Sequence, residues 1–365
     1  MNILEITGEP ILHGGQENFI YNILENINNT SFNIDVLTPY YCDNNRFKAL
    51  ISEKKGKVYE LNLDFRPWKS RKLICKPVLE FLKKKNYDLI HIHSGSISVL
   101  AYEAQAAQKA GIKKIIVHSH STGEKGLKHT MIQTAFSPLL KKYPTHYLAC
   151  NKEAGEMKFP KSVQPKVQII KNGINLNRFT RNQDIGNELR AKYGIPKDAF
   201  VVGHIGRFTI EKNHSFLIDC FESINRKIYD SYLVLVGEGE LQAEMKAKAK
   251  KLGLNDKVIF TGVVDNPYDY YNVFNYFVLP SIYEGFPFVT LEAQANGLPC
   301  LISTGVPETV MLTKYVKRLD LNTEKWAEFL VNNSSSGIQD NMDCLKEQGF
   351  DIAESAKIIE RIYTQ

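Results

Sequence analysis

At 365 residues the chain is long for one hydrophobic core, so two domains are expected. Its hydrophobic content of 43% and charged content of 24% are those of a globular protein, and no uninterrupted apolar run predicts a membrane span. The six cysteines are scattered without metal-ligand spacing, which argues against a zinc site or a disulfide framework. The sequence enters a strand directly after Met1 and has no secretory signal pattern, so we expect a cytoplasmic protein.

Short apolar runs alternate with amphipathic stretches through the first half of the chain. The runs that predict strands are 2–6, 33–38, 58–61, 89–93 and 114–118. The stretches that predict helices are 17–26, 71–85 and 98–110. This alternation indicates a parallel sheet with helices on both faces.

The same alternation restarts in the second half. Strands are predicted over 200–205, 232–236, 258–261, 276–279 and 299–303, and helices over 215–226, 240–252 and 290–295. We therefore predict an α/β protein of two doubly wound, Rossmann-like units, with a junction near 167–173. The domains expected are 1–170 and 171–350, and a last helix in 351–365 packs back on the N-terminal domain. Ligands bind beyond the carboxyl ends of such strands, and two facing sheets would form a central cleft there.

The strongest motif follows the predicted strand 276–279. It runs from Glu284 through Gly285, Phe286 and Pro287 to Glu292, with a helix expected to begin near Val289. Free amides at a helix start bind phosphate, and acceptor-only carboxylates suit sugar and ribose hydroxyls. The alternative is a solvated loop glutamate followed by an ordinary charged helix face.

Two further motifs follow strands of the second half. Arg207, after Gly203 and Gly206, and then Lys212 supply cations that would neutralise a diphosphate where a metal ion is lacking. The segment Gly237–Leu241 would close over a nucleotide base, although a lone pair of spaced glycines is weak evidence. Each motif could also be an ordinary turn with surface charges.

The first half carries two weaker signals. Gly14 and Gly15 precede a helix and offer an anion-binding loop, although no dinucleotide fingerprint is present. His118 and His120 end the fifth strand, where a histidine can bond a substrate hydroxyl or phosphate. A structural histidine is the alternative. No metal motif occurs, so no metal and no cofactor are expected.

Taken in order, these residues resemble the retaining glycosyltransferases of family four, which have the GT-B fold, and most of all the bacterial capsule and exopolysaccharide enzymes. The resemblance covers nearly the whole chain. The sequence departs from the family at Pro287, where glycine is usual, and at Asn175, where aspartate is common. The residues that carry the resemblance are His13–Glu17, His118–His120, Asn172–Ile174, Gly206, Arg207, Lys212, Gly237–Leu241 and Glu284–Glu292.

The resemblance implies a role for each of these residues. Glu284 and His120 are expected at the reacting sugar, with Gly285, Phe286 and Pro287 around it. The donor diphosphate would be held by Gly15, Arg207, Lys212, Phe288 and Val289. The nucleotide would lie against Gly237, Glu238, Leu241 and Glu292. The reaction implied moves a hexose or N-acetylhexosamine from a nucleotide diphosphate sugar, a UDP-sugar above all, to a saccharide or a lipid-pyrophosphate-linked saccharide.

The net charge of +6 arises in residues 1–170, where basic residues exceed acidic ones. This half is expected to bind the acceptor and to dock peripherally on an anionic membrane, although a solvated Lys-rich surface is the alternative. The basic positions lie around two partly apolar segments, 68–79 and 131–140. They are Arg66, Lys69, Arg71, Lys72, Lys76, Lys125, Lys128, Lys141 and Lys142, and the first segment includes Trp68, Leu73, Ile74 and Leu79.

Three alternatives to an active transferase remain. The first is a non-catalytic partner subunit of a transferase complex, which would keep the fold without needing the site residues. The presence of all four argues against it: Glu284, Glu292, Arg207 and Lys212. A nucleotide-sugar epimerase would need inward acid–base residues that the pattern does not indicate. Nucleic-acid binding is disfavoured, because the basic half contains no recognised module.

Overall fold

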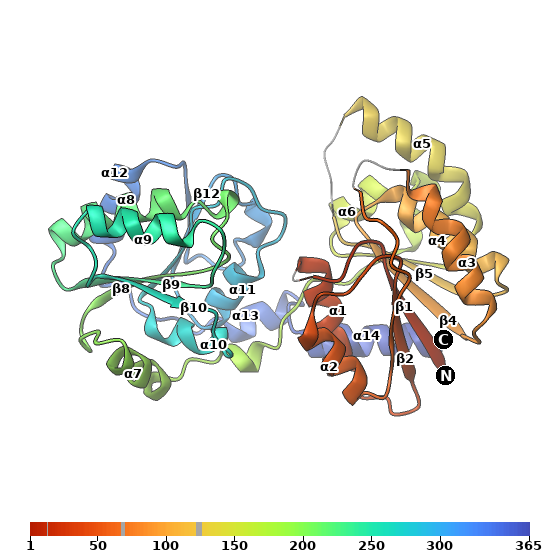
Figure 1. Ribbon diagram of the computed structural model, residues 1–365, viewed down its shortest axis with the longest axis horizontal. Helices are drawn as coiled ribbons and strands as arrows, with labels where there is room; N and C mark the ends of the chain where they lie inside the picture. The colour runs from red at the N-terminus through yellow and green to blue at the C-terminus, as the bar shows by residue number, and fades with distance from the viewer. Residues whose placement is uncertain (13, 67–69, 122–125) are drawn as a thin grey trace. The chain divides into compact units, whose positions relative to one another are not determined.

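The structure is a computed structural model that describes residues 1–12, 14–66, 70–121 and 126–365. His13, Trp68, Lys69 and Lys125 lie outside the described residues, as does the side chain of Lys128. The chain forms two compact units (Figure 1). The first comprises residues 1–173 and 352–365, and the second residues 174–351.

The first unit contains a seven-stranded parallel sheet in the order β3-β2-β1-β4-β5-β6-β7. The central position of β1 and the crossover to β4 make this a doubly wound sheet. Its strands are β1 (Asn2–Thr7), β2 (Asn33–Thr38), β3 (Val58–Glu60), β4 (Leu89–Ser94), β5 (Lys114–Ser119), β6 (His146–Ala149) and β7 (Val167–Ile169).

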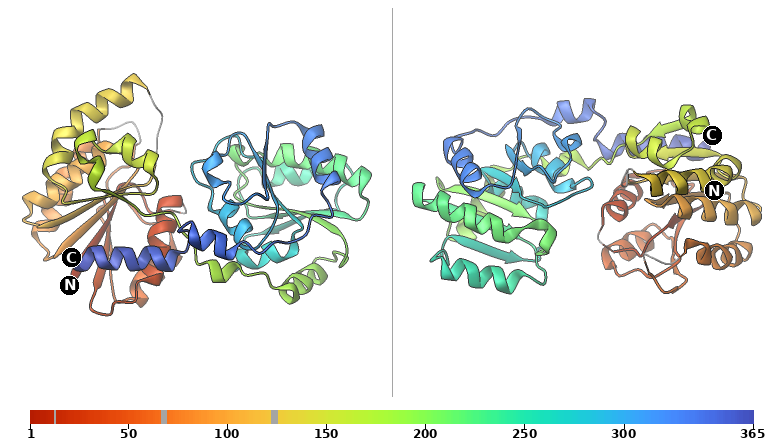
Figure 2. Two further views of the ribbon diagram at one scale, coloured as in Figure 1. Left: turned by 180° about the vertical axis from the view of Figure 1, so that it is seen from behind. Right: turned by 90° about the horizontal axis from the view of Figure 1, so that it is seen from above.

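Two groups of helices cover this sheet, and the two-residue period of the strands determines what each group meets. Leu4, Ile6, Ile90 and Ile92 belong to an apolar core with α3, α4 and α5. The alternate positions, among them Glu5, point toward α1 and the returning C-terminal helix α14, which lie side by side (Figure 2). The helices are α1 (Gly15–Asn26), α2 (Asn45–Glu53), α3 (Cys75–Lys83), α4 (Ile97–Lys109), α5 (Leu127–Lys142), α6 (Lys152–Lys158) and α14 (Ile352–Thr364).

The second unit repeats the architecture with a six-stranded parallel sheet in the order β10-β9-β8-β11-β12-β13. Its strands are β8 (Phe200–Ile205), β9 (Ser231–Val236), β10 (Val258–Gly262), β11 (Tyr276–Leu279), β12 (Cys300–Ser303) and β13 (Val316–Leu319). A large core packs under α8, α9 and α12 and includes the buried Trp326. The helices are α7 (Gln183–Lys192), α8 (His214–Lys227), α9 (Gln242–Lys251), α10 (Pro267–Tyr270), α11 (Phe288–Ala295), α12 (Thr323–Asn332) and α13 (Met342–Glu347).

The predicted α/β fold class, two doubly wound parallel-sheet units, is confirmed, but three strands were missed. Strands β6, β7 and β13 have only three or four residues each, and β7 and β13 are edge strands, so their hydrophobic signal is weak. The prediction of one helix over 71–85 was wrong, because a 3-10 turn η1 (Arg71–Ile74) precedes α3. In a continuous helix the ring of Pro77 would collide with the carbonyl of Leu73.

Candidate active site

Two loops at the carboxyl edge of the second sheet are joined by backbone hydrogen bonds. After β8, the amide of Phe208 donates to the carbonyl of Glu238 at 2.9 Å, and the amide of Leu241 donates back to Phe208 at 3.1 Å. Gly237 has a φ of +127°, and a Cβ added there would lie 2.3 Å from the carbonyl oxygen of Gly206. Only glycine allows this approach, so the loops carrying Arg207 and Glu238 form one surface.

The loop after β11 places Glu284 beside Lys212. The Nζ of Lys212 and the Oγ of Ser281 both donate to Oε1 of Glu284, at 2.6 Å and 2.7 Å. The side chains of Lys212 and Glu284 are only 22% and 15% exposed. The loop itself is held by the amide of Ile282 on the carbonyl of Glu211, at 2.8 Å. The result is a mostly buried, charge-assisted pair at the strand ends.

Helix α11 begins immediately after this loop at Phe288, one or two positions earlier than the start at Val289 or Thr290 that the sequence predicts. Pro287 is its N-cap residue, and Phe288 and Val289 are its first two residues. The amides at this first turn have no carbonyl to donate to within the α-helical pattern, and the turn has no acidic side chain. This end of the helix therefore has the polarity that favours an anion.

Glu292 lies further along α11 and has a different partner. Its Oε2 accepts a hydrogen bond from the hydroxyl of Tyr271 at 2.6 Å, and Tyr271 is fully buried. The ring of Phe286 stacks on Phe350 with ring centres 6.0 Å apart, while a Cβ on Gly285 would meet nothing within 4 Å. Phe286 is thus partly used in packing, whereas Gly285 leaves open space beside Glu284.

Not every predicted site residue is free for a ligand in this unit. Leu241 packs against the apolar core and is half-buried. Arg207 and Glu238 are exposed, and Gly237 is half-buried. The structure therefore brings Lys212 directly to Glu284, while Leu241 serves the core at least as much as any ligand.

In the first unit, Gly15 is the exposed first residue of α1, and Gly14 is its N-cap. A Cβ on Gly14 would lie 2.4 Å from Oε2 of Glu17, so any larger residue there would make the Glu17 side chain shift. Burial raises the pKa of Glu17, against the lowering effect of hydrogen bonds from its own backbone and that of Gly14. The backbone amides at the start of α1 are therefore already used by the carboxyl group of Glu17.

His120 follows β5 and belongs to a cluster of four histidines. His91 and His93 occupy alternate positions of β4, and His93 pairs in register with His118 of β5. The Nε2 of His120 and the Nδ1 of His93 are 2.9 Å apart, and the Nε2 of His93 lies 2.6 Å from Oε2 of Glu5. The cluster lies under Phe19 of α1, whose ring is 5.0 Å from that of His120.

Burial governs the charge of these histidines. It lowers the pKa of His93 to about 4, with a further contribution from His91. It also holds the pKa of His118 and of His120 well below the usual range. Burial alone would raise the pKa of Glu5, but charge interaction and hydrogen bonding with His91 and His93 outweigh it and leave the pKa low. The cluster therefore places an ionised Glu5 beside His93, His118 and His120, whose imidazoles are neutral at neutral pH.

Within the described residues, His91, His93 and His118 could together hold a metal ion, since one nitrogen from each lies within 4.8 Å of the others. Both nitrogens of His93 already make hydrogen bonds, to Glu5 and His120. A metal ion would have to displace one of them. We therefore interpret the cluster as a hydrogen-bond network.

Several residues of these sites were missed by sequence reasoning. Tyr271 was missed because its phenol could as well have been an ordinary core ring. Glu5, in an otherwise apolar strand, and the alternate histidines at 91 and 93 were visible signals of a polar face on one side of the sheet. Tyr363 could not be found, because its contact depends on α14 returning to the first sheet.

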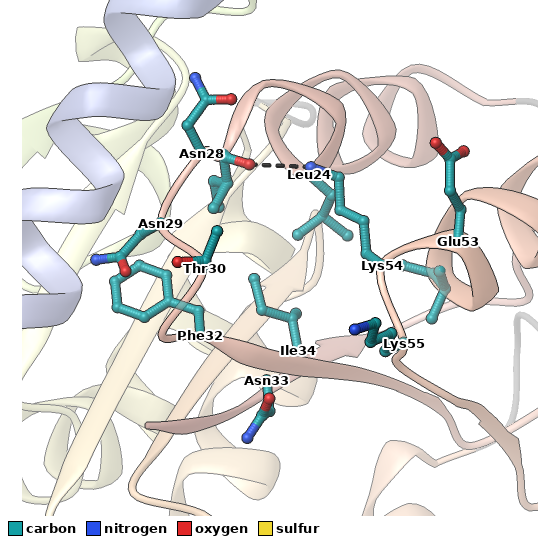
Figure 3. A pocket seen from close by; sticks show the side chains of 12 residues that line it. Leu24, Asn28, Asn29, Thr30, Phe32, Asn33, Ile34, Glu53, Lys54 and Lys55 are labelled. Atoms are coloured by element: carbon teal, nitrogen blue, oxygen red, sulfur yellow. Dashed lines mark hydrogen bonds between the residues drawn. The ribbon is translucent and has the colours of Figure 1, made fainter.

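A separate pocket of about 250 Å³ lies away from these residues (Figure 3). Its apolar side chains, among them Leu24, Phe32 and Ile34, turn toward one another, and Lys54 donates to the carbonyl of Ile27 at 2.9 Å. The pocket adjoins Asn33, where β2 begins, so it lies at the amino edge of the sheet. Ligands of doubly wound sheets bind at the opposite edge.

Two doubly wound parallel sheets in series are the architecture of the GT-B fold, which glycosyltransferases such as WaaG share. Two family models match the chain: Glycosyltransferase Family 4 over residues 13–178 and Glycosyl transferases group 1 over residues 186–329. EpsF of Bacillus subtilis, which is named as a glycosyltransferase, is 31% identical over 77% of this chain and 76% of its own. The chain therefore belongs to glycosyltransferase family four.

Two other relatives and one solved structure extend the comparison. The capsular polysaccharide biosynthesis glycosyltransferase CapH of Staphylococcus aureus is 28% identical over 68% of this chain and 69% of its own. A galactosyltransferase of Escherichia coli, named for UDP-Gal and α-D-GlcNAc-diphosphoundecaprenol, is 29% identical over 61% of this chain and 59% of its own. HepE of Anabaena, solved in complex with UDP, superposes with a TM-score of 0.76 at 18% identity, with both chains fully covered.

Proposed function

We propose that this chain transfers a hexose or N-acetylhexosamine from a nucleotide diphosphate sugar, a UDP-sugar above all, to a saccharide or lipid-pyrophosphate-linked saccharide in surface polysaccharide synthesis. We propose further that the anomeric configuration is retained and that no metal ion takes part. The relatives named for capsular polysaccharide and for UDP-Gal support this choice of pathway and donor.

The pair formed by Lys212 and Glu284 is the observation that carries the proposal. A cation and a carboxylate lie 2.6 Å apart beside the start of α11, where the cation would bind the diphosphate of a nucleotide sugar and the carboxylate would bind its sugar. Lys212 and Arg207 would neutralise the diphosphate, together with the amides of Phe288 and Val289. Glu284 would accept hydrogen bonds from hydroxyls of the transferred sugar.

The remaining predicted residues would bind the nucleotide, the diphosphate and the transferred sugar. Glu292, oriented by the hydroxyl of Tyr271, would accept from the ribose hydroxyls. Gly237, Glu238 and Leu241 would line the base. Gly285, Phe286 and Pro287 would shape the sugar pocket, Gly15 would contact the diphosphate from the first unit, and His120 would contact the sugar.

The retaining reaction that we propose needs no protein nucleophile. The leaving diphosphate would accept the proton of the acceptor hydroxyl on the face from which it departs, while the cations stabilise the charge that develops on it. Lys212 and Arg207 supply that stabilisation without a proton of their own being transferred. Closure over the donor would exclude water and limit hydrolysis.

We propose that the acceptor binds to the first unit. A cavity of about 150 Å³ lies beyond the carboxyl end of β2 and is lined by Tyr40, Arg66 and Arg71, among others. The guanidinium of Arg71 donates to the hydroxyl of Tyr40 at 2.6 Å and lies 5.0 Å from the ring centre of Phe65. A fixed guanidinium at this position would bind the pyrophosphate of a lipid-linked acceptor.

Peripheral docking on an anionic membrane is also proposed, through α5. Leu127 and Met131 of this helix are 87% and 72% exposed, and Lys141 and Lys142 lie in its last turn. Figure 1 shows α5 at the outside of its own unit. Of the other apolar positions expected at this surface, Leu73 is exposed, but Ile74 is buried in the fold and cannot insert. No helix among the described residues is both long and apolar enough to cross a bilayer.

The transfer reaction is tested by incubating the purified chain with a set of radiolabelled UDP-sugars and an undecaprenyl-pyrophosphate-linked monosaccharide, with EDTA present. We expect one UDP-sugar to yield a disaccharide whose new linkage has the anomeric configuration of the donor by NMR. An inverted product would overturn the retaining assignment. Product formed only after divalent metal is restored would overturn metal independence. Docking is tested separately, by flotation with phosphatidylglycerol vesicles at low salt, using Leu127→Ser with Met131→Ser as the variant.

A further inference from the structure

Three hydrogen bonds in series connect Tyr363 of the C-terminal helix to His120, and a fourth joins His91 to Tyr363. The hydroxyl of Tyr363 donates to Oε1 of Glu5, and the Nδ1 of His91 lies 2.7 Å from the same hydroxyl. Oε2 of Glu5 meets the Nε2 of His93 at 2.6 Å, and the Nδ1 of His93 meets the Nε2 of His120 at 2.9 Å. The first four of these side chains are almost completely buried, so water does not compete for their protons.

The protons of this series can be assigned from its charged end. Glu5 is ionised, because charge interaction and hydrogen bonding with His91 and His93 keep its pKa low despite its burial. An ionised carboxylate only accepts, so His93 must present its Nε2 as N–H. His93 is neutral at neutral pH, since burial lowers its pKa to about 4. Its Nδ1 is therefore a lone pair.

The lone pair on His93 determines the state of the next ring. The Nε2 of His120 must donate to it, so His120 carries its proton on Nε2. Burial keeps the pKa of His120 well below the usual range, so the ring has one proton and its Nδ1 is a lone pair. That nitrogen is covered and has no hydrogen-bond partner among the residues that the structure describes.

The other branch of the network agrees with this assignment. Tyr363 has one hydroxyl proton and gives it to Glu5, so its oxygen accepts from the Nδ1 of His91. The Nε2 of His91 is without a hydrogen-bond partner in the described part of the chain. The hydroxyl of Tyr363, the Nδ1–H of His91 and the Nε2–H groups of His93 and His120 thus each have an acceptor.

We propose that Glu5 and His93 are positioning residues that hold His120 in its Nε2–H tautomer, so that its Nδ1 can only accept a hydrogen bond from a hydroxyl of the transferred sugar. The inference rests on the proposed function for the role of His120 beside that sugar. The ligand contact requires the groups that cover Nδ1 to move aside. His120 is then neither an imidazolium nor a donor to the leaving diphosphate.

The tautomer is measured directly in the free wild-type protein, by two-bond nitrogen–proton NMR of nitrogen-15 histidine. We expect His120 to show a protonated Nε2 and an unprotonated Nδ1, with the signal assigned by its loss in His120→Asn. A protonated Nδ1 on His120, or an imidazolium at neutral pH, would overturn the proposal. Because no substrate is present, a protein that bound no nucleotide but showed the expected tautomer would count against the proposed function alone.

Three variants distinguish positioning from a purely structural role. Glu5→Gln keeps an acceptor for His93 and should keep the tautomer and most of the rate. Glu5→Leu removes that acceptor, so His93 can donate from Nδ1 instead and turn His120 to Nδ1–H. We then expect kcat to fall roughly tenfold or more with the donor KM little changed, since one hydrogen bond in the transition state is lost. Tyr363→Phe should leave the His120 tautomer unchanged. Equal kcat values in folded Glu5→Leu and Glu5→Gln would contradict the proposal.

Discussion

The ammonium nitrogen of Lys212 lies 2.6 Å from a carboxylate oxygen of Glu284, and the same oxygen accepts from the buried Ser281. Removing two charges from water costs free energy that a pair of this kind recovers only in part. A pair held mostly buried at the end of a parallel sheet is therefore better explained by ligand binding than by stability. The first prediction addresses this pair.

Glu284→Ala should lower kcat/KM by about 100-fold, since a group that contacts the reacting sugar stabilises the transition state by a few kcal/mol. The free energy of unfolding should change little, because Lys212 is 22% exposed and can turn toward water. The measurement is steady-state transfer together with urea unfolding. Glu308→Ala is the control, since this exposed residue also pairs with a cation, Arg318, at 3.0 Å. A Glu284→Ala rate close to that of the control would remove Glu284 from the site.

Tyr271→Phe should weaken the binding of the nucleoside diphosphate by roughly tenfold, because Glu292 loses the hydroxyl that orients it. Binding is measured by isothermal titration calorimetry. Tyr193→Phe is the control, since it removes a phenol hydroxyl from the same region, one bonded at 2.8 Å to the hydroxyl of Tyr270 and not to Glu292. If both variants bound the nucleotide equally well, Glu292 would have no role that depends on Tyr271.

Gly237→Ala should destabilise the second unit by about 2–3 kcal/mol, because it combines an unfavourable φ with a clash against the carbonyl of Gly206. Gly253→Ala is the comparison, because Gly253 also has a positive φ, +72°, but a Cβ there would meet nothing within 4 Å. It should cost only about 1 kcal/mol. Thermal unfolding followed by circular dichroism measures both. Equal losses would show that the approach of the two loops is not what requires glycine.

The stability of the second unit should fall as the pH is lowered below about 6.5, the usual pKa of histidine in an unfolded chain. Burial lowers the pKa of His214 to about 2, with contributions from His204 and Lys212, so the unfolded chain binds the proton more tightly. His214 adds no pH dependence above about pH 6.5, where it is neutral in both states, and below that pH the free energy of unfolding falls by the order of 1.4 kcal/mol per pH unit.

His214→Phe should reduce this pH dependence. The ring of His214 stacks on Phe208 with centres 3.9 Å apart, and within the described residues its nitrogens have no hydrogen-bond partner. A phenyl ring should therefore fit at pH 7 with a change of unfolding free energy below about 1 kcal/mol. Urea unfolding at pH 7 and pH 5 measures the difference. The same loss of stability in wild type and variant would show that His214 does not set it.

The sequence allowed the fold class to be predicted, because the alternation of strands and helices is a local pattern. Strand–helix alternation identified the doubly wound sheets, and the loop after β11 was recognisable from Glu284 and Gly285 in order. The network around Glu5 was not predicted, since it depends on three strands in register and on Tyr363 returning from the far end of the chain. Contacts of this kind follow from topology and not from spacing.

The central claim, that the second unit binds a nucleoside diphosphate sugar through Lys212 and Glu284, is tested most directly by a thermal-shift panel of UDP, GDP, ADP, TDP and CMP, with and without divalent metal. A ligand that binds only the folded state raises the melting temperature. We predict a metal-independent rise with UDP that is reduced in Lys212→Met and retained in Glu308→Ala. No shift with any nucleotide would contradict the account and favour a non-catalytic partner subunit with the same fold.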